Sequence, residues 1–184
     1  MTAIVGLEHL GAVYIGGDSA AIETDTMMIS VLKDEKVFID DSDRFIMGFS
    51  GSYRVGQLLR YSMKIPDPPP GDRMHYMVNA FIDTFRHMVK SKGVLTSNTG
   101  TDQQDAEVIV GLDGLLYVID SDFQVNRPKL GYFAIGIGGP IAMGAMYATK
   151  KSRMKPEKRI TLALKAAAEH NASVRPPFHI LKSY

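Results

Sequence analysis

Cysteine is absent from the 184-residue chain, which excludes disulfides, thiol nucleophiles and cysteine-ligated zinc. No apolar run approaches the roughly 18 residues of a membrane-spanning helix. The N-terminus has no basic region followed by an apolar region, so we see no secretory signal and expect a cytoplasmic protein without membrane contact. The formal net charge of +1 gives no global field that would recruit nucleic acid or a membrane.

Motifs for metals and cofactors are also missing. The glycine-rich stretch 136–139 has neither a Walker lysine nor a complete GxGxxG, so we do not expect it to cradle a nucleotide. The basic stretch 149–159 has no interleaved aromatics to stack bases, and it is more typical of a solvated connection between helices. We therefore expect no cofactor, no metal and no nucleic-acid partner. The five histidines are dispersed without metal-ligand spacing: His9, His75, His87, His170 and His179.

Short β-branched runs in the first fifty residues indicate strands. Residues 2–8 and 11–17 suggest one hairpin, and residues 35–40 and 44–50 suggest a second. The apolar period then becomes helical. One helical face carries Val55, Leu58, Leu59 and Met63.

Prolines in the stretch 65–72 must end this first helix, because proline removes a donor and clashes with a helical backbone. A second helix is expected over 73–93, with Asp72 as its cap and Gly93 as its stop. Its apolar stripe comprises Met74, Met77, Val78, Phe81, Phe85 and Met88.

The second half repeats the order of strands followed by helices. Residues 94–105 are polar and predict a loop. Asp113-Gly114 is a strong hairpin signal between two apolar runs. Pro140 suits the first turn of a helix. The expected elements are strands at 106–112, 115–120 and 131–139, helices at 140–151 and 156–170, and a closing strand at 178–183.

Segregated runs of strands and helices argue for an α+β fold instead of alternating βαβ units. We expect a four-layer αββα sandwich, in which two antiparallel sheets lie between helix pairs. This arrangement would bury every apolar stripe of the chain. No internal boundary is visible, so residues 1–184 are expected to form a single domain.

Five stretches together resemble the N-terminal-nucleophile (Ntn) hydrolases, and within them the proteasome β-subunits and the HslV-type peptidase. They are TAIVGLE, GAVYIGGDS, KVF, GFSGS and AIGIGGPIAMGA. The resemblance extends over nearly the whole chain and implies a threonine-type peptidase of the Ntn fold. The chemistry of such a site explains its residues. A threonine hydroxyl is a poor nucleophile and needs a base, which a free α-amine on the same residue can supply.

By this resemblance, Thr2 matches the nucleophile once Met1 has been removed. Asp18 matches the aspartate that pairs with a lysine, and Lys36 matches that lysine, with Lys33 as the alternative. A nearby ammonium would lower the pKa values of both the hydroxyl and the amine of the threonine.

Gly51 matches the glycine whose N–H forms the oxyanion hole. The resemblance also implies that Ala21 and Phe49 line the primary specificity pocket, with Tyr53 near its rim. It implies a homo-oligomeric ring or double ring that acts on polypeptides. A separate ATP-driven unfoldase is the partner that could feed such a ring.

Part of the chain departs from the family pattern. Ile137 stands where the family usually has a serine, and Asn171 and Val174 stand where it offers an aspartate and a serine or threonine. Ser173 could substitute if the alignment shifts by one residue. These departures support a second hypothesis, a proteasome-like ring subunit with a degenerate site and a scaffold or binding role. A third hypothesis keeps the enzyme but gives it a non-peptide amide as substrate.

Overall fold

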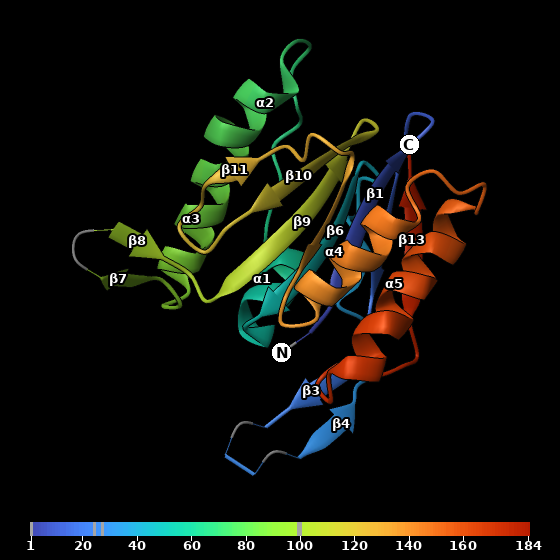
Figure 1. The fold of residues 1–184 in the computed structure, drawn as a ribbon. Coiled ribbons are helices and arrows are strands. Elements are labelled where there is room, and N and C mark those ends of the chain that lie inside the picture. Colours follow the sequence, from blue (N-terminus) through green and yellow to red (C-terminus); the bar gives the residue numbers. More distant parts are fainter. Residues whose placement is uncertain (1, 24, 27, 99–100) are drawn as a thin grey trace.

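Two antiparallel sheets form the centre of the computed structural model, which describes residues 2–23, 25–26, 28–98 and 101–184 (Figure 1). One sheet has the strand order β12-β1-β2-β13 and the other has the order β11-β10-β9-β6-β5. The four-stranded sheet comprises β1 (Ile4–His9), β2 (Ala12–Gly17), β12 (Tyr132–Ile135) and β13 (His179–Ser183). The five-stranded sheet comprises β5 (Val37–Ile39), β6 (Phe45–Gly51), β9 (Ala106–Leu112), β10 (Leu115–Ile119) and β11 (Val125–Asn126).

Helices cover the outer face of each sheet, as Figure 1 shows. The five-stranded sheet packs on α1 (Tyr53–Tyr61), α2 (Arg73–Tyr76), a π-helical turn η1 (Met77–Phe81) and α3 (Ile82–Ser91). The four-stranded sheet packs on α4 (Gly139–Ala148) and α5 (Pro156–His170). A third apolar cluster, which includes Ile15, Ile46 and Ile109, fills the space between the two sheets. The predicted αββα sandwich is therefore confirmed.

Two predicted hairpins close with the turn chemistry that their sequences indicate. The β1–β2 turn has Leu10 and Gly11 at φ values of 50° and 73°. The β9–β10 turn has Asp113 and Gly114 at φ values of 48° and 75°. Positive φ at both central residues is the signature of the type I′ turn, whose twist matches that of the paired strands.

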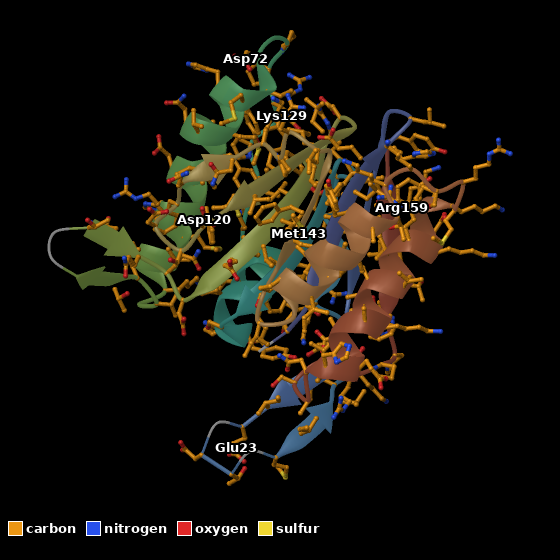
Figure 2. The ribbon with its side chains drawn as sticks, viewed as in Figure 1. Glu23, Asp72, Asp120, Lys129, Met143 and Arg159 are labelled. Carbon is orange, nitrogen blue, oxygen red and sulfur yellow. The ribbon has the colours of Figure 1, made fainter. Side chains whose placement is uncertain are left out.

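The helix expected over 73–93 forms with one correction to its apolar stripe. Asp72, labelled in Figure 2, caps it as predicted. Its side chain accepts hydrogen bonds from the N–H groups of Met74 and His75. The π-helical turn η1 then inserts an extra residue per turn and rotates the stripe. As a result Val78 is 43% exposed instead of facing the core. Ile82 and Val89 join the buried face in its place.

Several short strands were not predicted from the sequence. The hairpin β3 (Ala20–Ile22) and β4 (Ile29–Val31) projects from the sandwich, with Glu23 at its outer part (Figure 2). The interval 94–105, expected to be a loop, contains β7 (Thr96–Asn98) and β8 (Thr101–Gln103). The strand expected over 131–139 ends at Ile135, because Gly136 turns the chain at a φ of 82°.

Antiparallel pairing brings particular strand ends to one edge of the sandwich. The start of β1 pairs with the ends of β2 and β12, since Ile4 lies opposite both Gly17 and Ile135. The end of β6 pairs with the start of β9, where Gly51 lies opposite Ala106. We call this edge the site end, and we call the opposite edge, with the β1–β2 and β9–β10 turns, the far end. Among the described residues, none of the helices has the length and apolarity to cross a membrane.

Candidate active site

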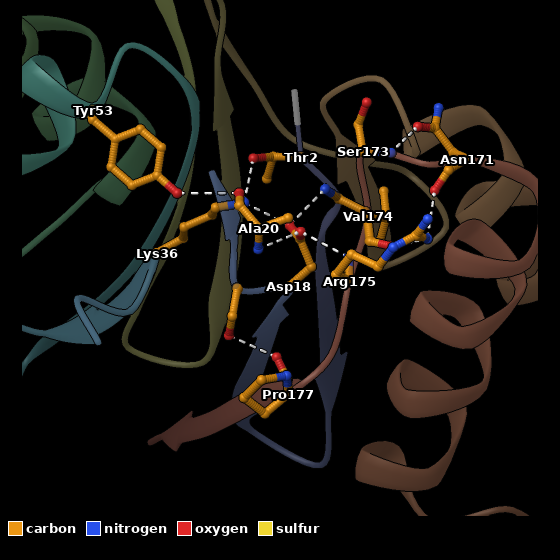
Figure 3. Close-up of polar contacts among 12 residues, drawn as sticks. Thr2, Asp18, Ala20, Lys36, Tyr53, Asn171, Ser173, Val174, Arg175 and Pro177 are labelled. Carbon is orange, nitrogen blue, oxygen red and sulfur yellow. Dashed lines mark hydrogen bonds and ion pairs between the residues drawn. The ribbon is translucent and has the colours of Figure 1, made fainter. Parts of the chain in front are cut away.

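Three polar side chains meet in the buried interior at the site end (Figure 3). The ammonium Nζ of Lys36 donates to Oγ1 of Thr2 at 2.6 Å and to Oδ1 of Asp18 at 2.8 Å. Each of the three residues is at most 2% exposed. Lys33, the alternative lysine, is exposed. The structure thus brings together the predicted nucleophile, aspartate and lysine from the segments around β1, β2 and β5.

Backbone N–H groups surround the carboxylate of Asp18. Its Oδ1 accepts from the N–H of Ala3 at 3.1 Å. Its Oδ2 accepts from the N–H groups of Ala20 at 3.0 Å and Arg175 at 3.2 Å. These hydrogen bonds and the ammonium replace the hydration that the carboxylate loses on burial. Asp18 therefore ties three separate chain segments to the ammonium of Lys36.

Burial and charge act in opposite directions on Lys36. Burial lowers the pKa of its ammonium below the usual value, because a charged group loses hydration in the interior. The negative charge of Asp18 and its hydrogen bond to Lys36 raise that pKa again. Burial has the larger effect, so the pKa of Lys36 is lowered overall while Asp18 opposes the change, and Nζ points directly at the hydroxyl of Thr2.

The main chain of Thr2 is held from the side of the four-stranded sheet. Its carbonyl oxygen accepts from the N–H of Gly138 at 3.1 Å. Gly136, two residues earlier, is packed so closely that a Cβ there would lie 2.4 Å from the same oxygen. The N–H of Gly136 in turn donates to Oε2 of Glu107 at 3.0 Å. The turn 136–139 therefore fixes the direction in which Thr2 enters the site.

Glu107 was missed in the sequence, although one signal was available. On β9 it alternates with residues of the helix-facing cluster and shares the inter-sheet face with Ile109. A carboxylate on an otherwise apolar buried face needs a partner. Its partner, Gly136, comes from the other sheet, so only the packed structure identifies it.

Gly51 lies where its N–H can face the space beside Thr2. The N–H of Phe49 donates to the carbonyl of Lys36, and the N–H of Ser52 donates to the carbonyl of Asp105 on the opposite side. Successive N–H groups of a strand alternate in direction, so the N–H of Gly51 points to the Lys36 side. Its φ of 97°, and a Cβ position 2.5 Å from the Asp105 oxygen, explain why glycine is needed there.

The three expected pocket residues lie next to this site in different settings. The hydroxyl of Tyr53 donates to the carbonyl of Ala20 at 3.2 Å, and burial raises its pKa to about 12. The Lys36 ammonium lies 5.9 Å from the Tyr53 ring centroid. Phe49 is buried edge-on against Tyr53, with ring centroids 5.7 Å apart. Ala21 is half-buried on β3.

Of the residues that depart from the family pattern, Ile137 lies within the turn 136–139, and Asn171 and Val174 lie in the segment after α5. Ile137 is half-exposed. Asn171 accepts through Oδ1 from the N–H of Ser173 at 2.9 Å and so turns the chain after α5. Val174 is fully buried and packs against Gly138. Ser173, the alternative residue, is also buried (Figure 3). This segment brings no carboxylate to the turn 136–139, although the N–H of Arg175 reaches Asp18.

Metal ligands do not accompany these groups. The described residues contain no group of three or more histidine, cysteine, aspartate or glutamate side chains that could hold a metal ion. The groups present are a hydroxyl, an ammonium, a carboxylate and directed backbone N–H groups. Such a set is suited to nucleophilic acyl transfer. The predicted removal of Met1 lies outside the described residues.

The fold matches that of the proteasome β-like Ntn hydrolases. BPH from Thiobacillus denitrificans superimposes with a TM-score of 0.81 at 18% identity, covering 98% of this chain and 97% of that one. HslV from Trypanosoma brucei gives a TM-score of 0.70 at 18% identity with full coverage of both chains. Anbu, an ancestral β-subunit from Yersinia bercovieri, gives 0.68 at 14% identity and covers 99% and 81%. No family model matches the chain. At these identities the likeness shows the fold.

Proposed function

We propose that the chain is a threonine-dependent Ntn peptidase of proteasome or HslV type, acting through an acyl-enzyme on Thr2 after Met1 is removed. The observation that carries the proposal is the buried contact of the Lys36 ammonium with both Thr2 Oγ1 and Asp18. Burying the Lys36–Asp18 pair beside a threonine hydroxyl removes the water that hydrates the two charged groups, which is energetically unfavourable. The arrangement is readily explained if that hydroxyl reacts.

The reaction assigns one role to each group. The free α-amine of Thr2 accepts the hydroxyl proton, directly or through a water, and Oγ1 attacks the scissile carbonyl carbon. The N–H of Gly51 stabilises the oxyanion, a contribution of about 3 kcal/mol for one such donor. The protonated amine gives its proton to the leaving amine, and an ester to Thr2 remains. Water, activated by the same amine, then hydrolyses the ester.

Lys36 and Asp18 act on the electrostatics of the nucleophile. The ammonium stabilises the developing alkoxide on Oγ1 and favours the neutral form of the nearby α-amine. Asp18 keeps Lys36 charged against the effect of burial, which lowers the pKa of the ammonium. Both residues are therefore expected to affect the chemical step more than the binding of substrate.

Substrate and assembly follow from the same proposal. Ala21, Phe49 and Tyr53 would line the pocket for the residue before the scissile bond, which favours apolar or small side chains. We propose a polypeptide substrate and a homo-oligomeric ring or double ring in the cytoplasm, with a separate ATP-driven unfoldase as a possible partner. One solved structure of BPH contains epoxomicin, so a peptide epoxyketone is a suitable probe for this site.

A second candidate function is a ring subunit with a degenerate site and a scaffold or binding role. The segment after α5 favours it, because Asn171 and Val174 supply no acidic or hydroxyl side chain there. Under this alternative Thr2 is a structural residue, and its hydroxyl only satisfies Lys36.

Intact mass spectrometry after incubation with a peptide epoxyketone distinguishes the two. The proposal predicts a mass without Met1 and one adduct per chain, since the probe reacts with a free α-amine and a hydroxyl together. Thr2→Ala should give no adduct, and Thr2→Ser should still give one because it keeps both groups.

A retained Met1 with no adduct would overturn the enzyme proposal for this chain and favour the scaffold role. Equal labelling of Thr2→Ala would show that the probe reacts elsewhere, and would also count against Thr2 as the nucleophile. Cleavage of a fluorogenic peptide by the wild type alone would extend the result from labelling to turnover.

A further inference from the structure

Glu107 is a half-buried carboxylate that the proposed reaction does not use. It extends from β9 of the five-stranded sheet and accepts, through Oε2, from the N–H of Gly136 after β12 of the other sheet, at 3.0 Å. Ile109, on the same face of β9, belongs to the apolar cluster between the sheets, and the buried Ser50 is the neighbour of Glu107 on β6. A carboxylate in such a place is costly unless it is hydrogen-bonded, so its position calls for an explanation.

The residue that Glu107 binds lies directly against Thr2. Gly136 has a φ of 82°, and a Cβ on it would lie 2.4 Å from the Thr2 carbonyl oxygen and 2.6 Å from Oγ of Ser50. Ser50 is the register partner of Glu107 across β6 and β9. Gly138, in the same turn, donates to the Thr2 carbonyl at 3.1 Å. Glu107 is thus linked to Thr2 through a single turn of main chain.

A second glutamate also links the two sheets and can be compared with Glu107. Glu8, on β1, accepts through Oε1 from the N–H of Leu116 on β10 at 2.6 Å. It also joins the two sheets at the far end of β1. Here the carboxylate comes from the four-stranded sheet and the N–H donor from the five-stranded sheet. Bracing the sheets is therefore common to both glutamates. Contact with the turn that holds Thr2 is a property of Glu107.

We propose that Glu107 is a positioning residue for the reaction at Thr2, acting through Gly136 and the turn 136–139. The inference rests on the proposed function and extends it. The Glu107 carboxylate fixes the N–H of Gly136, and the turn then fixes the Thr2 carbonyl and with it the placement of Oγ1. A misplacement of about 1 Å at a reacting atom costs roughly 100-fold in rate. Loss of Glu107 should therefore slow the chemical step and leave substrate binding nearly unchanged.

The test measures epoxyketone labelling over a range of probe concentrations, which separates the maximal rate from the half-saturating concentration. Glu107→Ala removes the acceptor, and we expect its maximal rate to fall about 10-fold or more. The half-saturating concentration should change less than about twofold. Glu107→Gln keeps an acceptor oxygen at the same reach and should restore most of the rate. Glu107→Asp keeps the charge but shortens the reach, so it should behave like the alanine variant.

Glu8→Ala is the matched control, because it removes the same kind of bond at the far end, together with an ion pair to Arg127 at 3.6 Å that is expected to contribute about 0–1 kcal/mol. It should lose a comparable amount of stability and label at the wild-type rate. The proposal is overturned if Glu8→Ala and Glu107→Ala slow labelling equally, or if Glu107→Gln labels as slowly as Glu107→Ala. A change confined to the half-saturating concentration would also overturn it, since that would indicate a binding role.

A measurement without activity separates this inference from the proposed function. The carbonyl ¹³C shift of Thr2 and the amide shift of Gly136 report the turn directly by NMR. Glu107→Ala should move both, and Glu8→Ala should move neither. If the wild type forms no adduct, the proposed function fails, while the NMR result still decides whether Glu107 positions Thr2. Unchanged Thr2 and Gly136 shifts in Glu107→Ala would overturn the inference.

Discussion

The two ends of the sandwich use the same kinds of contact in opposite surroundings. A glutamate crosses between the sheets at each end, Glu107 at the site end and Glu8 at the far end. Each end also contains ion-paired side chains. Lys36 and Asp18 are almost fully buried at the site end, whereas the side chains of Arg44 and Asp113 at the far end are 37% and 36% exposed.

Two glycines at positive φ, one at each end, differ in their surroundings. Gly11, in the β1–β2 turn, has a φ of 73°, and a Cβ added to it would have no described heavy atom within 4 Å outside its own chain neighbours. Gly136 has a φ of 82° and is packed against Thr2 and Ser50. At the far end, charge and turn geometry are solvated and serve the hairpins. At the site end, the same features are enclosed, so each change there acts on the position or charge of the proposed nucleophile.

The largest difference in the loss of unfolding free energy is expected between variants of the two ion pairs. Lys36→Met leaves the Asp18 carboxylate buried without its cation, and such a loss typically costs about 3–5 kcal/mol. Three backbone N–H donors remain on Asp18, which favours the lower part of this range. The free energy of unfolding, measured by urea denaturation at one protein concentration, checks the expectation.

Arg44→Met is the control for this comparison, because it breaks an exposed contact whose charged atoms lie 3.6 Å apart, while Asp113 keeps its ion pair to Arg73 at 2.6 Å. Surface pairs contribute about 0–1 kcal/mol. Losses of similar size in the two variants would show that burial does not distinguish the two ends. Epoxyketone labelling should be lost in Lys36→Met and retained in Arg44→Met.

A smaller difference in stability, together with a difference in labelling rate, is expected between alanine variants of Gly11 and Gly136. Gly11→Ala adds only the cost of a left-handed backbone, about 1–2 kcal/mol. Gly136→Ala adds overpacking against the Thr2 carbonyl oxygen, a further 1–3 kcal/mol or so. Because that contact moves Thr2, Gly136→Ala should also slow labelling, whereas Gly11→Ala should not. Denaturation midpoints and labelling rates of both variants provide the measurement.

The contrast fails if Gly136→Ala labels at the wild-type rate while remaining folded. It also fails if Gly11→Ala slows labelling, because the β1–β2 turn lies at the opposite end of β1 from Thr2.

The sequence predicted the far end better than the site end, for physical reasons. Hairpin turns depend on adjacent residues, so Asp113-Gly114 could be recognised directly. The layers follow from apolar periodicity, which the buried clusters confirm. The meeting of Thr2, Asp18 and Lys36 was expected from a resemblance, and the hydrogen bonds of Lys36 now join all three.

Other parts of the site depend on contacts between distant segments. Glu107 and Gly136 are 29 positions apart, and no local pattern pairs them. The π-helical turn that exposes Val78 breaks the 3.6-residue period on which the prediction relied. The hairpin β3–β4 is three residues per strand, too short for a clear alternation.

The smallest effect concerns a single hydroxyl at the site end. Tyr53→Phe keeps the ring beside Lys36 and removes the donor to the Ala20 carbonyl, so it should cost about 1 kcal/mol. The raised Tyr53 pKa of about 12 adds a pH dependence. Above pH ~10 the unfolded state loses the tyrosine proton first, so this residue's stabilising contribution is complete below that pH and declines as the pH rises toward 12.

The stability advantage of the wild type over Tyr53→Phe should therefore shrink above about pH 9 and reverse by about pH 11.5 in urea denaturation, because the loss of about 1.4 kcal/mol per unit of pKa difference comes to exceed the hydroxyl's contribution. Tyr61→Phe, on the same helix, removes a hydroxyl from a residue that is 67% exposed. It should change the free energy of unfolding by less than about 0.5 kcal/mol at either pH. If Tyr53→Phe matches Tyr61→Phe, the Tyr53 hydroxyl does not brace the segment that carries Asp18 and Ala20. A difference that stays constant with pH would show instead that the hydroxyl braces the segment while its ionisation is the same in the folded and unfolded chain.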